Sequence, residues 1–328
     1  MNTFKSFEAS LYAVNDSNFE DIAIRLFRFQ AENSPVYNRY LQNLKVNPFK
    51  IEKIEQIPFL PISFFKTQSI QTGSWTPEVE FSSSGTTGSL TSRHAVADLN
   101  FYLRHAEKTF EQFYGKLQQY HILALLPAYL ERKGSSLIAM MDHFIKKSGS
   151  EHSGFYLYNH DELVQKMEVL KSSSRKILVW GVSFALLDLA EHFEVDLSNA
   201  IVMETGGMKG RRQELTRQEL HTFLNQRFNT AVIHSEYGMT ELMSQAYSTG
   251  NGYYQIPPWM KVVIREINDP FCYVRNKSGG VNVVDLANFH SCAFIETQDL
   301  GKITEAGELE ILGRIDNSDI RGCNLLVE

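Results

Sequence analysis

Short apolar runs alternate with helical patterns through the middle of this chain. Runs typical of buried strands occur at 121–127, 176–182, 200–204 and 231–234. Between them, residues 184–193 have a helical pattern, and a second helix is predicted after Thr216, which matches a capping box with Glu219. Strand–helix–strand alternation predicts an α/β fold with a mostly parallel sheet that helices cover on both faces.

The pattern differs at the two ends of the chain. Residues 1–50 read as helices; Asp16 or Ser17 is expected to cap the first long one, and Pro35 to end it and open the next. After about Tyr253, turn sequences separate short strand candidates at 261–267, 281–285, 292–296 and 308–312. The predicted organisation is a helical arm (1–50), an α/β core (51–252) and an antiparallel β subdomain with a tail (253–328).

Composition and charge narrow the class of protein. The chain of 328 residues is 43% hydrophobic and 21% charged, as in an ordinary globular protein, and its net charge of -6 comes without a basic block, which argues against a nucleic-acid partner. No apolar run approaches the ~20 residues of a membrane span, and the N-terminus does not resemble a signal peptide.

The three cysteines are Cys272, Cys292 and Cys323, with no CxxC spacing. Such a sparse, odd set argues against a disulfide framework and against a structural zinc site, so a reducing cytoplasm is the expected location. Cys272 and Cys292 lie in or near strand candidates and are expected in the core.

The segment 82–89 reads Ser-Ser-Ser-Gly-Thr-Thr-Gly-Ser and follows a possible strand at 79–81. Glycines let backbone N–H groups turn toward an anion, and small hydroxyl residues add donors without bulk. The segment therefore suits a polyphosphate cradle, although no Walker Gly-Lys-Ser/Thr closes it; a flexible surface loop is the alternative. The candidate contacts are Ser83, Ser84, Gly85, Thr86, Thr87 and Gly88.

A second candidate segment, 235–241, follows the strand predicted at 231–234, and strand ends in parallel sheets are where ligands bind. Tyr237, followed by Gly238, could stack on a base, and the Thr240 hydroxyl could meet a phosphate. Glu241 could hold Mg²⁺, a cation that takes carboxylate oxygens. The alternative is a helix start in which Thr240 is the cap.

Three weaker signals accompany these segments. Gly206 and Gly207 follow another strand and would let a flat base approach the backbone, unless they form an ordinary strand-to-helix turn. Asp299 could accept both hydroxyls of a ribose, and Arg314 offers a planar cation for phosphate or sugar oxygens. Asp-Leu-Gly and Gly-Arg are also common turn sequences.

Taken in order, these segments resemble the motifs of the adenylate-forming superfamily of acyl-CoA synthetases, peptide-synthetase adenylation domains and luciferases. The matching motifs are Ser-Gly-Thr-Thr-Gly, Tyr-Gly-x-Thr-Glu, Asp-Leu-Gly and Gly-Arg-x-Asp. The resemblance implies the large N-terminal domain of that superfamily, with ATP or AMP and Mg²⁺ bound by the 51–252 core and its neighbours. It also implies catalytic roles for Thr240, Glu241 and Arg314, with Glu241 as the metal ligand.

Within the superfamily, the chain most resembles the acyl-protein synthetases of bacterial luminescence, and then the phenylacetate-CoA ligases. The segment 126–136 and the ending Arg-Gly-Cys-Asn-Leu-Leu at 321–326 carry the first resemblance. The departures are Gln298 where the family has glycine, a compressed hinge, and the absence of the C-terminal lid domain with its lysine. Lys209 and Arg93 are candidates to replace that lysine.

The resemblance implies an enzyme that activates a carboxylic acid, of the fatty class, to an acyl-adenylate and transfers the acyl group to a thiol. The thiol is either Cys323, followed by a partner protein, or that of coenzyme A or a carrier protein. A small hydrophobe in a turn is the alternative for Cys323. A non-catalytic scaffold that binds nucleotide or a partner is the alternative for the whole chain.

Overall fold

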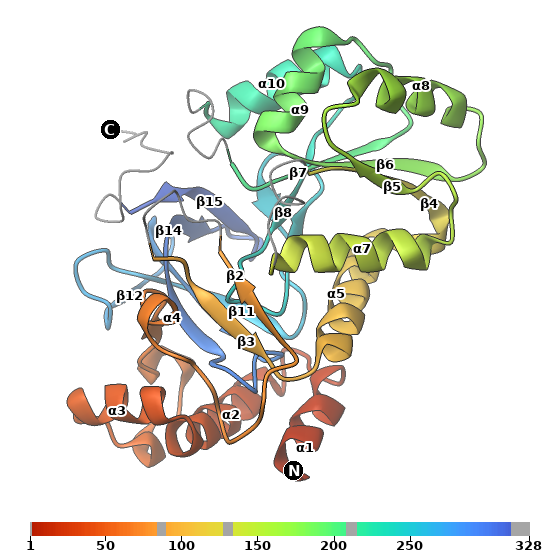
Figure 1. Cartoon of the computed structure of the whole chain (residues 1–328). Helices are drawn as coiled ribbons and strands as arrows, with labels where there is room; N and C mark the ends of the chain where they lie inside the picture. The colour runs from red at the N-terminus through yellow and green to blue at the C-terminus, as the bar shows by residue number, and fades with distance from the viewer. Residues whose placement is uncertain (1, 84–89, 127–133, 208–214, 316–328) are drawn as a thin grey trace. The chain divides into compact units, whose positions relative to one another are not determined.

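The computed structural model describes residues 2–83, 90–126, 134–207 and 215–315. Within these ranges the chain forms two compact units (Figure 1). Unit 1 contains the described residues of Met1–Ala106, Gly238–Gln245 and Ile256–Ile315, and unit 2 contains those of Glu107–Tyr237 and Ala246–Gln255. Each unit is therefore assembled from segments that are distant in the sequence.

Unit 1 combines N-terminal helices with an antiparallel sheet. Its helices are α1 (Asn2–Leu11), α2 (Phe19–Asn33), α3 (Pro35–Asn43), α4 (Phe64–Thr67) and the short 3-10 helices η1 (Pro48–Lys50) and η2 (Ile54–Gln56). Its strands are β1 (Leu60–Pro61), β2 (Val79–Ser82), β3 (Arg93–Val96), β11 (Met260–Arg265), β12 (Tyr273–Val274), β13 (Gly279–Asp285), β14 (Phe294–Ile303) and β15 (Leu309–Arg314).

The main sheet of unit 1 has the order β15-β14-β13-β11-β12, with antiparallel neighbours, and β1 adds a parallel pairing to β14. Strands β2 and β3 form a separate antiparallel pair. Phe27 of α2 and Phe294 of β14 meet edge to face at 5.7 Å, and Tyr37 of α3 stacks beside them. The helices therefore bury the apolar face of this sheet.

Unit 2 contains the parallel sheet that the alternating pattern predicts. Its strands are β4 (Tyr120–Leu125), β5 (Gly154–Tyr156), β6 (Lys176–Val182), β7 (Ile201–Thr205), β8 (His234–Tyr237), β9 (Ala246–Ser248) and β10 (Tyr253–Tyr254). Its helices are η3 (Leu117–Gln119), α7 (Ser136–Ser148), α8 (His160–Leu170), α9 (Ser183–His192) and α10 (Arg217–Arg227), and α5 (Leu99–Tyr114) passes into it from unit 1.

The order of the unit 2 sheet is β5-β4-β6-β7-β8-β9, and every neighbouring pair is parallel except β8 with β9. Helices α8, α9 and α10 cover one face and α7 covers the other (Figure 1). Trp180 of β6 is fully buried and contacts Phe110, Phe144 and Tyr247. The α/β prediction is confirmed in this unit.

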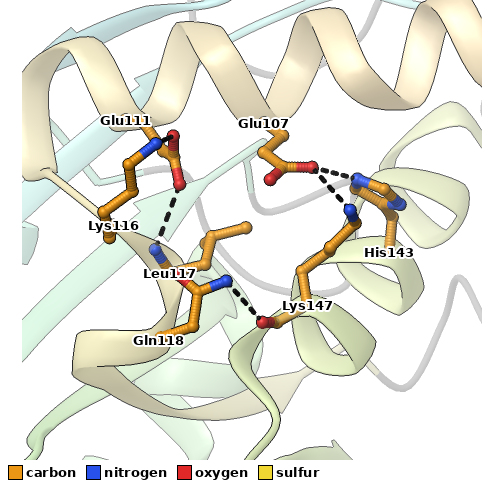
Figure 2. Close-up of polar contacts among 7 residues, drawn as sticks. All are labelled: Glu107, Glu111, Lys116, Leu117, Gln118, His143 and Lys147. Atoms are coloured by element: carbon orange, nitrogen blue, oxygen red, sulfur yellow. Dashed lines mark hydrogen bonds and ion pairs between the residues drawn. The ribbon is translucent and has the colours of Figure 1, made fainter.

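Polar contacts join the second half of α5 to η3 and α7 in unit 2 (Figure 2). The Glu107 carboxylate lies 2.7 Å from His143 Nε2 and 3.8 Å from Lys147 Nζ. Gln118 Nε2 donates to the Lys147 carbonyl at 3.0 Å. These contacts hold α7 beside α5 and η3.

Several local predictions are confirmed and others are wrong. Thr216 and Glu219 form the predicted capping box at the start of α10. The cap position of α2 is Asn18, not Asp16 or Ser17, and the Ser17 N–H donates to the Asn15 side chain. Pro35 opens α3 as expected.

Strand ends also differ from the predictions. The strand predicted at 231–234 is displaced: β8 begins only at His234 and continues to Tyr237. Strand β14 continues to Ile303, well beyond the run predicted at 292–296. Polar residues take part in both strands because a neighbouring strand pairs with their backbone. No described helix is long and apolar enough to cross a membrane.

Candidate active site

Asp299 and Arg314 lie opposite each other in neighbouring strands of unit 1. They are paired across β14 and β15, and Arg314 Nε is 3.4 Å from Asp299 Oδ1. The alternative in which both segments are turns is wrong, because Asp299, Leu300 and Gly301 belong to β14 and Arg314 ends β15. The strand pairing therefore joins two site candidates that are separated in sequence.

Gly301 has a steric role in this pairing. A Cβ atom there would lie 2.6 Å from the Glu310 carbonyl oxygen and 2.8 Å from Val281 Cγ2. The β14–β15 register also shifts between Leu300 and Gly301, next to Asp299. The glycine of the Asp-Leu-Gly motif thus allows the two strands to approach closely.

Replacing Gly301 with alanine should therefore lower the free energy of unfolding by about 1–3 kcal/mol, the usual cost of overpacking. The measurement is urea unfolding followed by circular dichroism. Gly154→Ala is the matched control, because a Cβ on this strand glycine has nothing within 4 Å and should change stability by less than about 0.5 kcal/mol. Equal stability of the two variants would contradict the steric argument.

Glu241 is buried near the Asp299–Arg314 pair, with 4% of its surface exposed. Burial raises the pKa of this carboxyl; a hydrogen bond with Ser92 and the charge of Arg314 oppose the rise, and Asp299 adds to it. Thr240 and Glu241 form a turn without a helix, so the alternative in which Thr240 caps a helix is wrong. Two carboxylates and a guanidinium therefore share one region of unit 1.

Ser83 belongs to the same region of unit 1. Its backbone N–H donates to the Ser92 carbonyl at 2.9 Å, and its Oγ accepts from the Ser92 N–H at 2.9 Å. The two serines thus bind each other through two hydrogen bonds, and Ser92 also reaches Glu241. The other residues predicted for the phosphate cradle lie outside the described part: Ser84, Gly85, Thr86, Thr87 and Gly88.

The chemistry of Glu241 fits an Mg²⁺ ligand. Burial disfavours its negative charge, and a bound cation would restore that charge. Among the described residues no group of three or more histidine, cysteine, aspartate or glutamate side chains could hold a metal ion alone. Mg²⁺ commonly takes only one or two protein carboxylates and completes its shell with substrate phosphates and water.

Gly206, Gly207 and Tyr237 lie in unit 2. Because β7 and β8 are parallel neighbours with Thr205 opposite Glu236, the three residues stand at the same carboxyl edge of the sheet. Gly206 has a φ of 73°, in the left-handed region, and a Cβ atom on Gly207 would meet nothing within 4 Å.

The Tyr237 ring is buried, and its centroid lies 5.9 Å from that of the Tyr254 ring. The next residue, Gly238, is exposed and belongs to unit 1.

Two buried carboxylates at this sheet edge were not singled out from the sequence. Glu204 accepts from Ser183 Oγ at 2.9 Å and lies 3.6 Å from His221 Nε2. Burial opposes its ionisation, yet the nearby His221 and Arg217 and the Ser183 hydroxyl lower the pKa of Glu204 overall. The sequence did contain a signal for Glu204, because it is an acidic residue at the end of the apolar run 200–204.

Glu236 is the second of these carboxylates. It accepts a hydrogen bond from Thr205 Oγ1. Burial, and to a smaller extent the charge of Glu204, raise the pKa of Glu236 from 4.5 to about 7, although the Thr205 hydrogen bond opposes the rise. Neighbouring strands thus place two acidic side chains with opposite pKa shifts at one sheet edge.

The remaining candidates have mixed outcomes. Cys292 is buried as expected, and burial raises its pKa to about 12. The core prediction for Cys272 is wrong: this residue is exposed in the turn before β12. Arg93 is an exposed residue at the start of β3. Lys209 and Cys323 lie outside the described residues, so their predicted roles stay predictions.

No protein-family model matches this sequence, and no curated protein is significantly similar to it. Solved structures do match. An ATP-bound MatB from Rhodopseudomonas palustris has a TM-score of 0.55 with 16% identity over 72% of this chain. A 2-hydroxyisobutyryl-CoA ligase in the postadenylation state, in complex with R3-HIB-AMP, has a TM-score of 0.67 with 11% identity over 92% of this chain.

The chain spans about half the length of MatB, 47%, and 68% of the 2-hydroxyisobutyryl-CoA ligase. The similarity includes the combination of a parallel sheet with antiparallel sheets that the two units display. At these identities it establishes the fold. The described chain therefore has the α/β fold of the parts of these ligases that it matches.

Proposed function

We propose that this chain uses ATP to activate a carboxylic acid as an acyl-adenylate and then transfers the acyl group to a thiol. The observation that carries the proposal is the grouping of Ser92, Glu241, Asp299 and Arg314 in unit 1. Glu241, Asp299 and Arg314 come from three of the five motif segments, and Ser92 follows a fourth, the segment 82–89. They provide the carboxylates, hydroxyl and guanidinium that binding a metal-complexed nucleotide requires.

The first half-reaction joins the acid to the nucleotide. An oxygen of the substrate carboxylate forms a bond to the α-phosphorus of ATP, and the bond from that phosphorus to its bridging oxygen breaks, so pyrophosphate leaves. Arg314 and the Thr240 hydroxyl would stabilise the charge on the α-phosphoryl oxygens. Glu241 would hold Mg²⁺, which neutralises phosphate charge when it is bound. Asp299 would accept the ribose hydroxyls.

The second half-reaction needs a thiolate. Its sulfur forms a bond to the acyl carbon, the bond from that carbon to the AMP oxygen breaks, and AMP leaves with the electron pair. We propose Cys323 as the acceptor; Arg321, two residues before it in the sequence, offers the kind of positive charge that favours a thiolate. In this form of the proposal the substrate is a fatty acid, and a partner protein finally receives the acyl group from Cys323.

Coenzyme A is the second candidate acceptor. One of the similar structures is an open conformation of the 2-hydroxyisobutyryl-CoA ligase in complex with 2-HIB-AMP and CoA. Incubation with ATP, an activated acid and either coenzyme A or no added thiol separates the two. An acyl label on the protein that hydroxylamine removes, and that disappears in Cys323→Ser, would support the cysteine; a label that persists in this variant would refute it.

The central experiment is a pyrophosphate-exchange screen over fatty, aromatic and amino acids, with unfolding temperatures measured in parallel with and without ATP and Mg²⁺. We expect exchange with at least one acid, and a higher unfolding temperature with nucleotide, because a ligand that binds only the folded state stabilises it. A shift without exchange for any acid would favour a nucleotide-binding scaffold. The absence of both would refute the proposed function.

A further inference from the structure

Two buried side chains of unit 1 hold the backbone of the Thr240–Glu241 turn. His94 Nδ1 lies 2.8 Å from the Thr240 carbonyl oxygen, and Asn288 Nδ2 donates to the Glu241 carbonyl at 2.7 Å. His94 Nε2 also lies 3.1 Å from Asn288 Oδ1. His94 and Asn288 are each 1% exposed. Strand β3 and the turn after β13 are thereby linked to the two carbonyls.

The Nδ1 contact is the shorter of the two contacts of the imidazole, 2.8 Å against 3.1 Å. A carbonyl oxygen only accepts, so Nδ1 must carry a proton. Burial lowers the pKa of His94 to about 4, and its contacts with Thr240 and Asn288 oppose that shift. The Phe65 ring meets the imidazole edge to face at 5.8 Å and fixes its plane.

Asn288 is itself anchored. Gln30 of α2 donates to the Asn288 carbonyl at 3.0 Å and to the Ser291 carbonyl at 3.3 Å, and accepts from the Ala293 N–H at 2.9 Å. The turn after β13 is thus tied to α2. A side chain on such a fixed turn can define the position of the Glu241 backbone.

The residues after Glu241 are held through their backbone N–H groups. The buried Asp285 carboxylate accepts from the Met243 and Ser244 backbone N–H groups at 2.8 and 2.9 Å. Residues 240–245 lie in neither a helix nor a strand, so side chains must satisfy their buried backbone groups. Asp285 fixes residues 243 and 244, and His94 and Asn288 fix residues 240 and 241.

We propose that His94 and Asn288 are positioning residues for Glu241, which keep its carboxylate beside Ser92, Asp299 and Arg314. The proposal rests on the proposed function, because only a metal-binding Glu241 requires this precision. Neither side chain supplies a ligand; each acts through a backbone carbonyl. Loss of such an outer contact typically weakens a metal site 10- to 100-fold.

Two substitutions of His94 separate positioning from packing. An asparagine amide nitrogen can take the place of Nδ1 and donate to the Thr240 carbonyl. A glutamine amide lies near the place of Nε2 and leaves that carbonyl without its donor. His94→Gln should therefore raise at least tenfold the Mg²⁺ concentration that gives half-maximal pyrophosphate exchange, whereas His94→Asn should stay within about threefold of the wild type.

Calorimetry of ATP binding gives a readout that does not depend on turnover. In His94→Gln the ATP affinity measured with Mg²⁺ should fall, while the affinity without Mg²⁺ should stay unchanged. His121→Gln is the matched control: it removes another buried histidine, which contacts Ser150 and Ser173 in unit 2, and should leave both affinities unchanged. If His94→Gln does not fold, Asn288→Ser, which removes the donor to the Glu241 carbonyl, takes its place in both measurements.

The outcomes are distinct. A folded His94→Gln with a normal Mg²⁺ response, or equal losses in His94→Gln and His94→Asn, would overturn the positioning role while leaving the proposed function in place. A wild-type protein with neither exchange nor Mg²⁺-dependent ATP binding would refute the proposed function itself, and the positioning role with it.

Discussion

Replacing Glu241 with glutamine should lower acid-dependent pyrophosphate exchange about 100- to 1000-fold, the usual loss when one preorganised electrostatic group is removed. Glutamine keeps the size of the side chain and an oxygen that can accept the Ser92 hydrogen bond. It removes the negative charge that would hold Mg²⁺. The exchange rate is measured with the acid that the screen identifies, at saturating ATP and Mg²⁺.

The same substitution should not destabilise the protein. Burial is the main influence on the Glu241 carboxyl and raises its pKa, so a neutral amide is at least as well tolerated there without metal. Urea unfolding without nucleotide checks this expectation. Glu305→Gln, at an exposed residue between β14 and β15, is the control for a lost surface charge. Near-normal exchange by Glu241→Gln would contradict the metal role.

Replacing Glu236 with glutamine should stabilise the protein at pH 8 by about 3 kcal/mol. Burial, with a smaller contribution from Glu204, raises the pKa of Glu236 from 4.5 to about 7, a difference of about 2.5 units, and each unit corresponds to about 1.4 kcal/mol. The folded protein binds this proton more tightly than the unfolded chain. Stability at this site is therefore greatest below pH 4.5 and falls as the pH rises toward 7.

Unfolding free energies at pH 5 and pH 8 test this expectation. The gain from Glu236→Gln should be small at pH 5 and large at pH 8. Glu204→Gln is the matched control with the opposite sign: the nearby His221 and Arg217 and the Ser183 hydroxyl hold the pKa of Glu204 below its usual value despite burial. Its replacement should lower stability at pH 8. A pH-independent effect of Glu236→Gln would show that Glu236 does not titrate in this range.

Local sequence patterns predicted the secondary structure well where one chain segment decides it. The run at 176–182 is strand β6, and the Thr216–Glu219 capping box opens α10. Prediction was poor where polar residues continue a strand. The second half of β14, including Asp299, has no apolar alternation, and its pairing with β13 and β15 makes it a strand.

The candidate site shows the same division. The order of the motifs predicted that Glu241, Asp299 and Arg314 all take part in nucleotide chemistry. It did not indicate that Asp299 and Arg314 are cross-strand neighbours, which depends on the β14–β15 register. It also did not indicate that His94 and Asn288 bind the Thr240 and Glu241 carbonyls, because such contacts leave no spacing pattern in the sequence.

The sequence by itself determined the α/β class, the main helices and strands, and the residue types available for nucleotide chemistry, because hydrophobic periodicity and short motifs are local properties of a chain. The tertiary structure decided which of those residues lie close to one another and how deeply each is buried. Strand register, the burial that gives Glu204 and Glu236 opposite pKa shifts, and the contacts that fix the Thr240–Glu241 turn all arise between segments far apart in sequence. Such non-local pairings depend on the packing of the whole unit, which no local pattern encodes.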